Sequence, residues 1–178
     1  MSQAEQSQVM GGHAGARQRL AREGHLLVAG PYGKQKSDPA LRGLYVFDTA
    51  DRERAKQLAE TDPGFQAGVF AFDYHTISTD APFRRYIDAE LAADSGMRNY
   101  VLATFEKGSA AAELMGSHPA TLFFAMLDET RALVLLDAKD EAAARTLLEP
   151  MAARIGAFRL DEWMSAARLA TLPKLPRD

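Results

Sequence analysis

The chain has 178 residues, of which 47% are apolar and 25% are charged, and its net charge is −3. This composition is typical of a globular domain, and it lacks the surplus of lysine and arginine that would neutralise a phosphate backbone, so nucleic acid is excluded as an expected partner. The chain has no cysteine, which excludes disulfides, thiolate nucleophiles and cysteine-based metal sites and favours a cytoplasmic location.

The apolar segments of the chain are short. Two of the longest, residues 121–127 and 132–136, are far below the roughly 20 residues that a membrane-spanning helix needs. The first eight residues are too polar for a signal peptide. We therefore expect no contact with a membrane.

The first predicted element is an amphipathic helix over residues 3–23. Apolar side chains and one histidine recur on a single face at helical spacing, namely Val9, His13, Ala16 and Leu20, and Gly24 follows as a stop. Two short apolar runs, residues 25–30 and 41–47, then predict a pair of strands. The connection between these strands is polar and contains glycine and proline, which is typical of a loop.

A second helix and a third strand complete the first half. Asp51 offers an N-cap oxygen for the helix, and Asp62-Pro63 predicts its end because the residue before a proline is disfavoured in the α region. Residues 69–77 then alternate in character, which predicts a further strand.

The second half of the chain repeats the order of the first. Three pairs of segments correspond: residues 44–51 with 133–140, Asp62-Pro63 with Glu149-Pro150, and residues 68–75 with 156–163. Repetition on this scale predicts an internal duplication of about 90 residues rather than a solenoid. We place one unit at residues 1–78, a linker at 79–96 with a short helix over 83–91, and a second, degenerate unit at 97–170.

The two units differ at their beginnings. Residues 99–105 are a clear opening strand for the second unit, whereas the first unit begins directly with its helix. A sheet that lacks one strand exposes an unpaired edge. We therefore expect residues 99–105 to pair with strands of the first unit, or the first unit to take an edge strand from a neighbouring chain. A misplaced start of the sequence is a third explanation.

Three stretches of the first unit, residues 13–31, 41–47 and 62–68, resemble YCII-related (YciI-like) proteins. The shared features are a histidine in a helix, an Ala-Gly-Pro turn after a strand, and a late Asp-Pro followed by Ala-Gly. The resemblance covers residues 9–75. Residues 98–108 are also similar to the usual first strand of the family, here displaced to the middle of the chain.

The resemblance implies a fold and a site. The implied fold is α+β, with two tandem ferredoxin-like βαββαβ units in a dimeric α+β barrel, formed either within one chain as a pseudo-dimer or by a homodimer. The implied site is a His–Asp dyad that corresponds to His13 and Asp62. Some members are similar to enzymes that remove chloride from chlorinated hydroxyhydroquinones, so the implied substrate is a small aromatic or unsaturated acid.

Both members of this dyad also have simpler interpretations. A histidine on a face with Val9 and Leu20 is commonly a partly buried core residue, and an Asp-Pro pair commonly forms a turn. However, an acid in the last turn of a helix opposes the helix dipole at a cost of about 0.3–1 kcal/mol, which favours another use for Asp62. If the two side chains meet, the carboxylate selects one imidazole tautomer, and His13 can move a proton on a phenolic or enolic substrate.

Four further residues are candidates for substrate binding. Ala29, Gly30 and Pro31 are expected to line the pocket beside the dyad. Arg42 could hold an anionic oxygen, although an arginine in a strand is more commonly a solvated surface residue.

The sequence predicts neither a metal site nor a cofactor. The other histidines lack the spacing and the carboxylate neighbours of a zinc site, namely His25, His75 and His118. Gly11-Gly12 does not follow a strand, as a phosphate-binding loop would. The second unit keeps an acid at Glu149 but has no histidine in the position of His13.

Two classes of function follow. The first is a cofactor-independent lyase or isomerase, such as a dehydrochlorinase, in which His13 is the general acid/base and Asp62 orients it. The alternative is a non-catalytic module that binds a small ligand inside a barrel or interacts with another protein. A small molecule is the expected partner of the first class, and the fold does not discriminate between the two.

Overall fold

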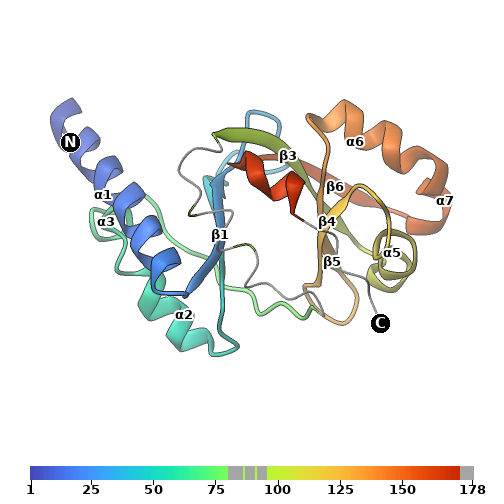
Figure 1. Ribbon diagram of the computed structural model, residues 1–178, viewed down its shortest axis with the longest axis horizontal. Helices are drawn as coiled ribbons and strands as arrows, with labels where there is room; N and C mark the ends of the chain where they lie inside the picture. The colour runs from blue at the N-terminus through green and yellow to red at the C-terminus, as the bar shows by residue number, and fades with distance from the viewer. Residues whose placement is uncertain (80–85, 87–90, 92–95, 173–178) are drawn as a thin grey trace.

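The computed structural model describes residues 1–79, 86, 91 and 96–172, which form helices and two antiparallel sheets (Figure 1). The predicted α+β class is therefore confirmed. No helix among these residues is long and apolar enough to span a bilayer. The predicted linker at 79–96 and its helix at 83–91 lie almost entirely outside the described residues.

The first half contains three helices and two strands: α1 (Gln3–Arg22), β1 (Leu26–Pro31), β2 (Gly43–Phe47), α2 (Arg52–Ala59) and α3 (Pro63–Gln66). A capping box starts α1, because the side chains of Ser2 and Glu5 each bond to the other's backbone. Gly24 follows the end of α1 with a φ of +77°, which glycine adopts at little cost. The two strands form an antiparallel pair with Tyr45 opposite Ala29.

The helix that was predicted to end at Asp62-Pro63 ends earlier, at Ala59. Asp62 is instead the N-cap of α3, where its side chain accepts a hydrogen bond from the backbone N–H of Gly64. The argument that Asp62 opposes a helix dipole is therefore wrong, because an acid at a helix N-terminus is favourable. Pro63 fits the first position of α3, since its missing N–H is not needed there.

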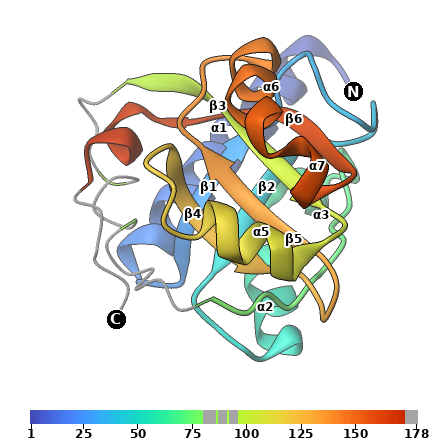
Figure 2. The ribbon, with the colours of Figure 1, turned by 90° about the vertical axis from the view of Figure 1, so that its right-hand side faces the viewer.

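The second half contains a four-stranded antiparallel sheet with the order β4-β5-β3-β6. Its elements are β3 (Met97–Phe105), α5 (Gly108–Met115), β4 (Thr121–Met126), β5 (Ala132–Leu136), α6 (Glu141–Leu148), η1 (Glu149–Met151), α7 (Ala152–Ile155), β6 (Phe158–Ala166) and η2 (Ala167–Thr171). The helices α5, α6 and α7 cover the outer face of this sheet (Figure 2). Met115, Leu148 and Ile155 of these helices are buried in one apolar cluster with Phe105 and Phe124 of the sheet.

The two sheets lie between two layers of helices, so the molecule has four layers (Figure 1). An apolar cluster between the sheets includes Val28 and Val46 of the smaller sheet and Leu102, Leu135 and Trp163 of the larger one. On the opposite face of the smaller sheet, a third cluster joins α1, β1 and α2. The smaller sheet is therefore buried on both faces, which explains why β1 is almost entirely apolar.

Strand β3 includes the predicted strand at 99–105, but its partners differ from the expected ones. It lies between β5 and β6, with Phe105 opposite Ala132 on one side and Phe158 on the other. The prediction that residues 99–105 pair with strands of the first half is therefore wrong. Strands of its own half occupy both edges of β3.

Residues 69–77 alternate as a strand would, but they form no ladder with a described strand. In the second half, the corresponding strand β6 pairs along its length with β3. The described part of the first half contains no strand equivalent to β3, so residues 69–77 lack the neighbour that a ladder requires. Their alternating aromatic side chains, Phe70, Phe72 and Tyr74, nevertheless contact one another in a row.

Segments of the first half border both outer strands of the larger sheet. Beside β6, Gly33 N donates to Glu162 O at 2.7 Å, and Glu162 N donates to Gln35 O at 2.8 Å. Beside β4, Ser78 and Met126 exchange two backbone hydrogen bonds of 2.9 and 2.7 Å. These bonds pair backbone groups at the edges of the sheet and join the two halves of the chain.

Candidate active site

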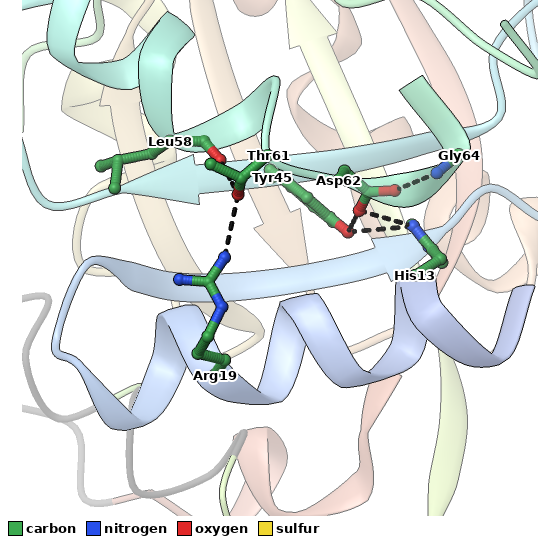
Figure 3. Close-up of polar contacts among 7 residues, drawn as sticks. All are labelled: His13, Arg19, Tyr45, Leu58, Thr61, Asp62 and Gly64. Atoms are coloured by element: carbon green, nitrogen blue, oxygen red, sulfur yellow. Dashed lines mark hydrogen bonds and ion pairs between the residues drawn. The ribbon is translucent and has the colours of Figure 1, made fainter. Parts of the chain in front are cut away.

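His13 and Asp62 are 49 residues apart in sequence, and the structure brings their side chains into contact. His13 lies on α1, Asp62 lies at the beginning of α3, and His13 Nδ1 is 2.8 Å from Asp62 Oδ2 (Figure 3). This distance is that of a charge-assisted hydrogen bond.

A close approach of α1 and α3 produces this contact. A Cβ atom added to Gly12 would lie 3.0 Å from Cγ of Pro63, so the absence of a side chain at residue 12 lets the two helices meet. Gly64 is equally restricted, because a Cβ atom there would lie 2.3 Å from the ring of Phe70. The two glycines thus place the helix that carries His13 against the turn that carries Asp62.

Asp62 is completely buried, whereas the side chain of His13 is 26% exposed. A buried carboxylate is costly unless donors surround it, and Asp62 has three. Its Oδ1 accepts from Gly64 N at 2.8 Å, and its Oδ2 accepts from both His13 Nδ1 and Tyr45 Oη. Both oxygen atoms of the buried carboxyl group therefore have a hydrogen-bond donor.

Sequence reasoning did not identify Tyr45, although its hydroxyl lies 3.1 Å from Asp62 Oδ2 (Figure 3). Its side chain lies on the face of β2 that the helices cover, as does that of Phe47 two residues later. A tyrosine hydroxyl on a covered face needs a hydrogen-bond partner, and this requirement is the signal that could have led to Tyr45.

Two aromatic rings hold the imidazole of His13. The Tyr45 ring is stacked with it at a centroid distance of 6.0 Å, and the Phe70 ring meets it edge-on at 5.3 Å. Within the described residues, Nε2 of His13 has no hydrogen-bond partner, unlike Nδ1. The ring is therefore fixed on one side by Asp62 and available for proton transfer at the other nitrogen.

The other candidate residues lie away from this contact. The carbonyl oxygen of Ala29 accepts from Ser165 Oγ at 3.0 Å, and that of Gly30 accepts from Trp163 Nε1 at 2.9 Å, so both residues help to join β1 to β6. Gly30 has no room for a side chain, because an added Cβ would lie 1.8 Å from the carbonyl oxygen of Met164. Pro31 and Arg42 are exposed, and no contact joins either to His13 or Asp62.

A surface groove of about 420 Å³, a size that suits small ligands, lies between α2 and the aromatic row. Its lining residues are Arg52, Glu53, Lys56, Glu60, Phe72 and Tyr74. Burial, followed by the nearby carboxylates of Glu60 and Glu53, raises the pKa of Tyr74. Phe72 also packs against Tyr45 at a ring distance of 5.8 Å, so the groove and the dyad have an aromatic neighbour in common. His13 and Asp62 do not line the groove.

The space between the two sheets is nearly filled. It contains a cavity of about 10 Å³, lined only by apolar and aromatic side chains such as Leu44, Leu102 and Trp163. This volume is at the lower limit for a single water molecule.

The rest of the described chain offers neither a metal site nor a second dyad. No three potential metal-ligating side chains gather within the described residues. His118 uses Nδ1 to accept a bond from Ala120 N in a local turn, and Glu149 lies exposed at the start of η1.

A family model matches part of the first half of the chain. The model of the YCII-related domain matches residues 1–74, which contain both members of the dyad and Tyr45. No curated protein and no solved structure matches the chain.

Proposed function

We propose that this chain, whose residues 1–74 match the model of the YCII-related domain, is a cofactor-independent lyase or isomerase acting on a small aromatic or unsaturated acid. His13 is the general acid/base and Asp62 orients it. The observation that carries the proposal is the bond between a fully buried carboxylate and a partly exposed imidazole. Moving a carboxylate out of water is costly, and this carboxylate is buried where it bonds to one nitrogen of an imidazole. That geometry is the geometry of an oriented general acid/base.

The proton transfer follows from the hydrogen bonds. An ionised Asp62 can only accept, so the neutral imidazole keeps its proton on Nδ1 and presents a lone pair on Nε2. Nε2 can then accept a proton from a phenolic or enolic hydroxyl and return it at another atom of the substrate. The aromatic rings of Tyr45 and Phe70 keep the imidazole in one orientation during this exchange.

A few YCII-related proteins are similar to enzymes that remove chloride from chlorinated hydroxyhydroquinones, and this supplies a concrete reaction for testing. Such a substrate loses two hydroxyl protons, gains one proton at the carbon that carried chlorine, and releases chloride with the bonding electron pair, so the net loss is HCl and the product is a hydroxybenzoquinone. The reaction needs no external oxidant or reductant, because the chloride ion leaves with both electrons of the C–Cl bond and the ring is thereby oxidised to the quinone. His13 supplies the proton transfers that this elimination requires.

We also propose that residues 1–78 and 97–170 are two ferredoxin-like units in a pseudo-dimeric α+β barrel. The strand order of the second half and the facing sheets support this interpretation. The non-catalytic alternative, in which the barrel interior holds a ligand, gains no support from a cavity of about 10 Å³. A cytoplasmic location and a small-molecule partner are part of the same proposal.

The function is tested by chloride release from a monochlorinated hydroxyhydroquinone with the full chain. We expect His13→Gln to lower kcat by roughly 10²–10⁴-fold, since this is the usual contribution of a general acid/base. Asp62→Asn should lower kcat by at least about tenfold, because the imidazole tautomer is no longer held. The matched control is His75→Gln, which changes an exposed histidine outside the dyad and should leave the rate unchanged. Chloride release that is equal in the wild type and the His13→Gln variant would contradict the proposal.

A further inference from the structure

The carboxylate oxygen that binds His13 has a second donor, the hydroxyl group of Tyr45 (Figure 3). Tyr45 Oη is 3.1 Å from Asp62 Oδ2 and 3.4 Å from His13 Nδ1. The three polar atoms thus form a compact triangle in which Oδ2 is the only one that cannot donate. Both protons, from the hydroxyl and from the imidazole, therefore point at Oδ2.

The competing arrangement is unfavourable. If Tyr45 donated to Nδ1 instead, the proton of the neutral imidazole would sit on Nε2, and the Nδ1 lone pair would face the carboxylate at 2.8 Å. Two electron-rich atoms at that distance repel each other. The hydroxyl and the carboxylate together thus exclude this tautomer.

Packing does not explain the hydroxyl. The ring of Tyr45 contacts Phe47 and Phe72 as well as His13, and a phenylalanine ring would make the same contacts. The hydroxyl group adds the interactions with Asp62 and His13. Tyr74 in the same aromatic row provides a contrast, because its buried hydroxyl has no hydrogen-bond partner among the residues that the structure describes.

We propose that Tyr45 is a positioning residue of the dyad. Its hydroxyl donates a hydrogen bond that fixes the position of Asp62 Oδ2. The carboxylate in this position holds the proton of His13 on Nδ1, so Nε2 remains the proton-accepting atom. Only the catalytic consequence rests on the function proposed above. The tautomer itself is a property of the free protein.

The test compares Tyr45→Phe with Tyr74→Phe in the full chain labelled with ¹⁵N. Long-range ¹H–¹⁵N spectra report the tautomer of each of the four histidines, and the His13 signals are assigned with His13→Gln. In the wild type and in Tyr74→Phe, we expect one His13 tautomer with a slowly exchanging Nδ1 proton. In Tyr45→Phe, we expect a mixture of tautomers. We also expect the Nδ1 proton to exchange about tenfold faster, because the variant lacks one hydrogen bond to a charged group.

Unchanged tautomer and exchange in Tyr45→Phe would overturn the inference. Equal changes in the two variants would overturn it as well, since they would reflect packing of the aromatic row. For chloride release, Tyr45→Phe should lower kcat and leave KM unchanged. If the wild type releases no chloride but the spectra behave as expected, the function fails and the positioning role stands.

Discussion

At the scale of single residues, Asp62 is the centre of the site. Its side chain is completely buried. One carboxylate oxygen caps α3 by accepting from Gly64 N, and the other accepts from His13 and Tyr45. His13 contributes less to the fold, because its side chain is partly exposed and its loss leaves Asp62 with two donors. We therefore expect substitution of Asp62 to lower both stability and activity, and substitution of His13 to lower mainly activity.

Asp62→Ala should destabilise the protein much more than His13→Ala. Removal of the carboxylate leaves the hydroxyl of Tyr45 and the N–H of Gly64 without their acceptor and removes a helix cap, at a combined cost of about 2–4 kcal/mol. His13→Ala should cost about 1 kcal/mol, since it removes one partly exposed hydrogen bond. Urea unfolding of both variants measures the difference. Equal losses would show that Asp62 does not stabilise the fold through these bonds.

At the scale of elements, the packing of α1 on α3 decides whether the dyad forms. Three glycines lie in α1, but only Gly12 faces another element. An added Cβ would find nothing within 4 Å at Gly11 or Gly15, whereas at Gly12 it would lie 3.0 Å from Pro63. Glycine in a helix interior is destabilising relative to alanine. Gly12 therefore lowers the stability of α1 itself but allows α1 and α3 to approach each other closely.

Alanine substitutions test this packing. Gly11→Ala and Gly15→Ala should each raise the free energy of unfolding by roughly 0.5–1 kcal/mol, because they only improve helix propensity. Gly12→Ala should gain less or lose stability, and it should weaken the His13 to Asp62 contact by moving α1 away from Pro63. Urea unfolding and the His13 Nδ1 proton signal measure the two effects. An equal gain at all three positions would rule out tight packing at Gly12.

At the scale of the whole molecule, the apolar cluster between the two sheets contains a fully buried tyrosine, Tyr100, and a partly buried one, Tyr32. Burial, followed by the charge of Asp161, raises the pKa of Tyr32 to about 12, and Tyr32 pairs with Trp163 of β6. Burial also raises the pKa of Tyr100 to about 12, and its hydroxyl donates to the carbonyl of Ala166 at 2.8 Å. Both hydroxyls stay protonated in the folded protein well above the ordinary tyrosine pKa of about 10.

Stability should therefore fall at alkaline pH. Between about pH 10 and pH 12 the unfolded chain releases these two protons and the folded chain keeps them, so the free energy of unfolding decreases as pH rises through this window. The contribution is fully present below about pH 10. Urea midpoints at pH 9, 10.5 and 12 measure the decrease, which should be smaller in the double variant Tyr32→Phe, Tyr100→Phe. A double variant as pH-sensitive as the wild type would contradict the assignment.

The amino-acid sequence by itself determined the class of the fold and the two ends of the dyad. Apolar runs and capping residues are local signals, and they predicted α1, both strands of the smaller sheet and β3. The identification of His13 and Asp62 came from the resemblance of residues 9–75 to YCII-related proteins, which rests on motifs that are also local. Each of these signals depends on neighbours in the chain.

The tertiary structure alone decided the partners. Local pattern cannot distinguish an Asp-Pro that ends one helix from an Asp-Pro that caps the next, so the electrostatic role of Asp62 was predicted with the wrong sign. Strand partners depend on which edges remain available after folding, so β3 paired within its own half and residues 69–77 formed no ladder with a described strand. Tyr45 of β2 bonds to Asp62, 17 residues later in the chain, and hydrogen bonds between distant segments arise only when packing brings their atoms within about 3 Å.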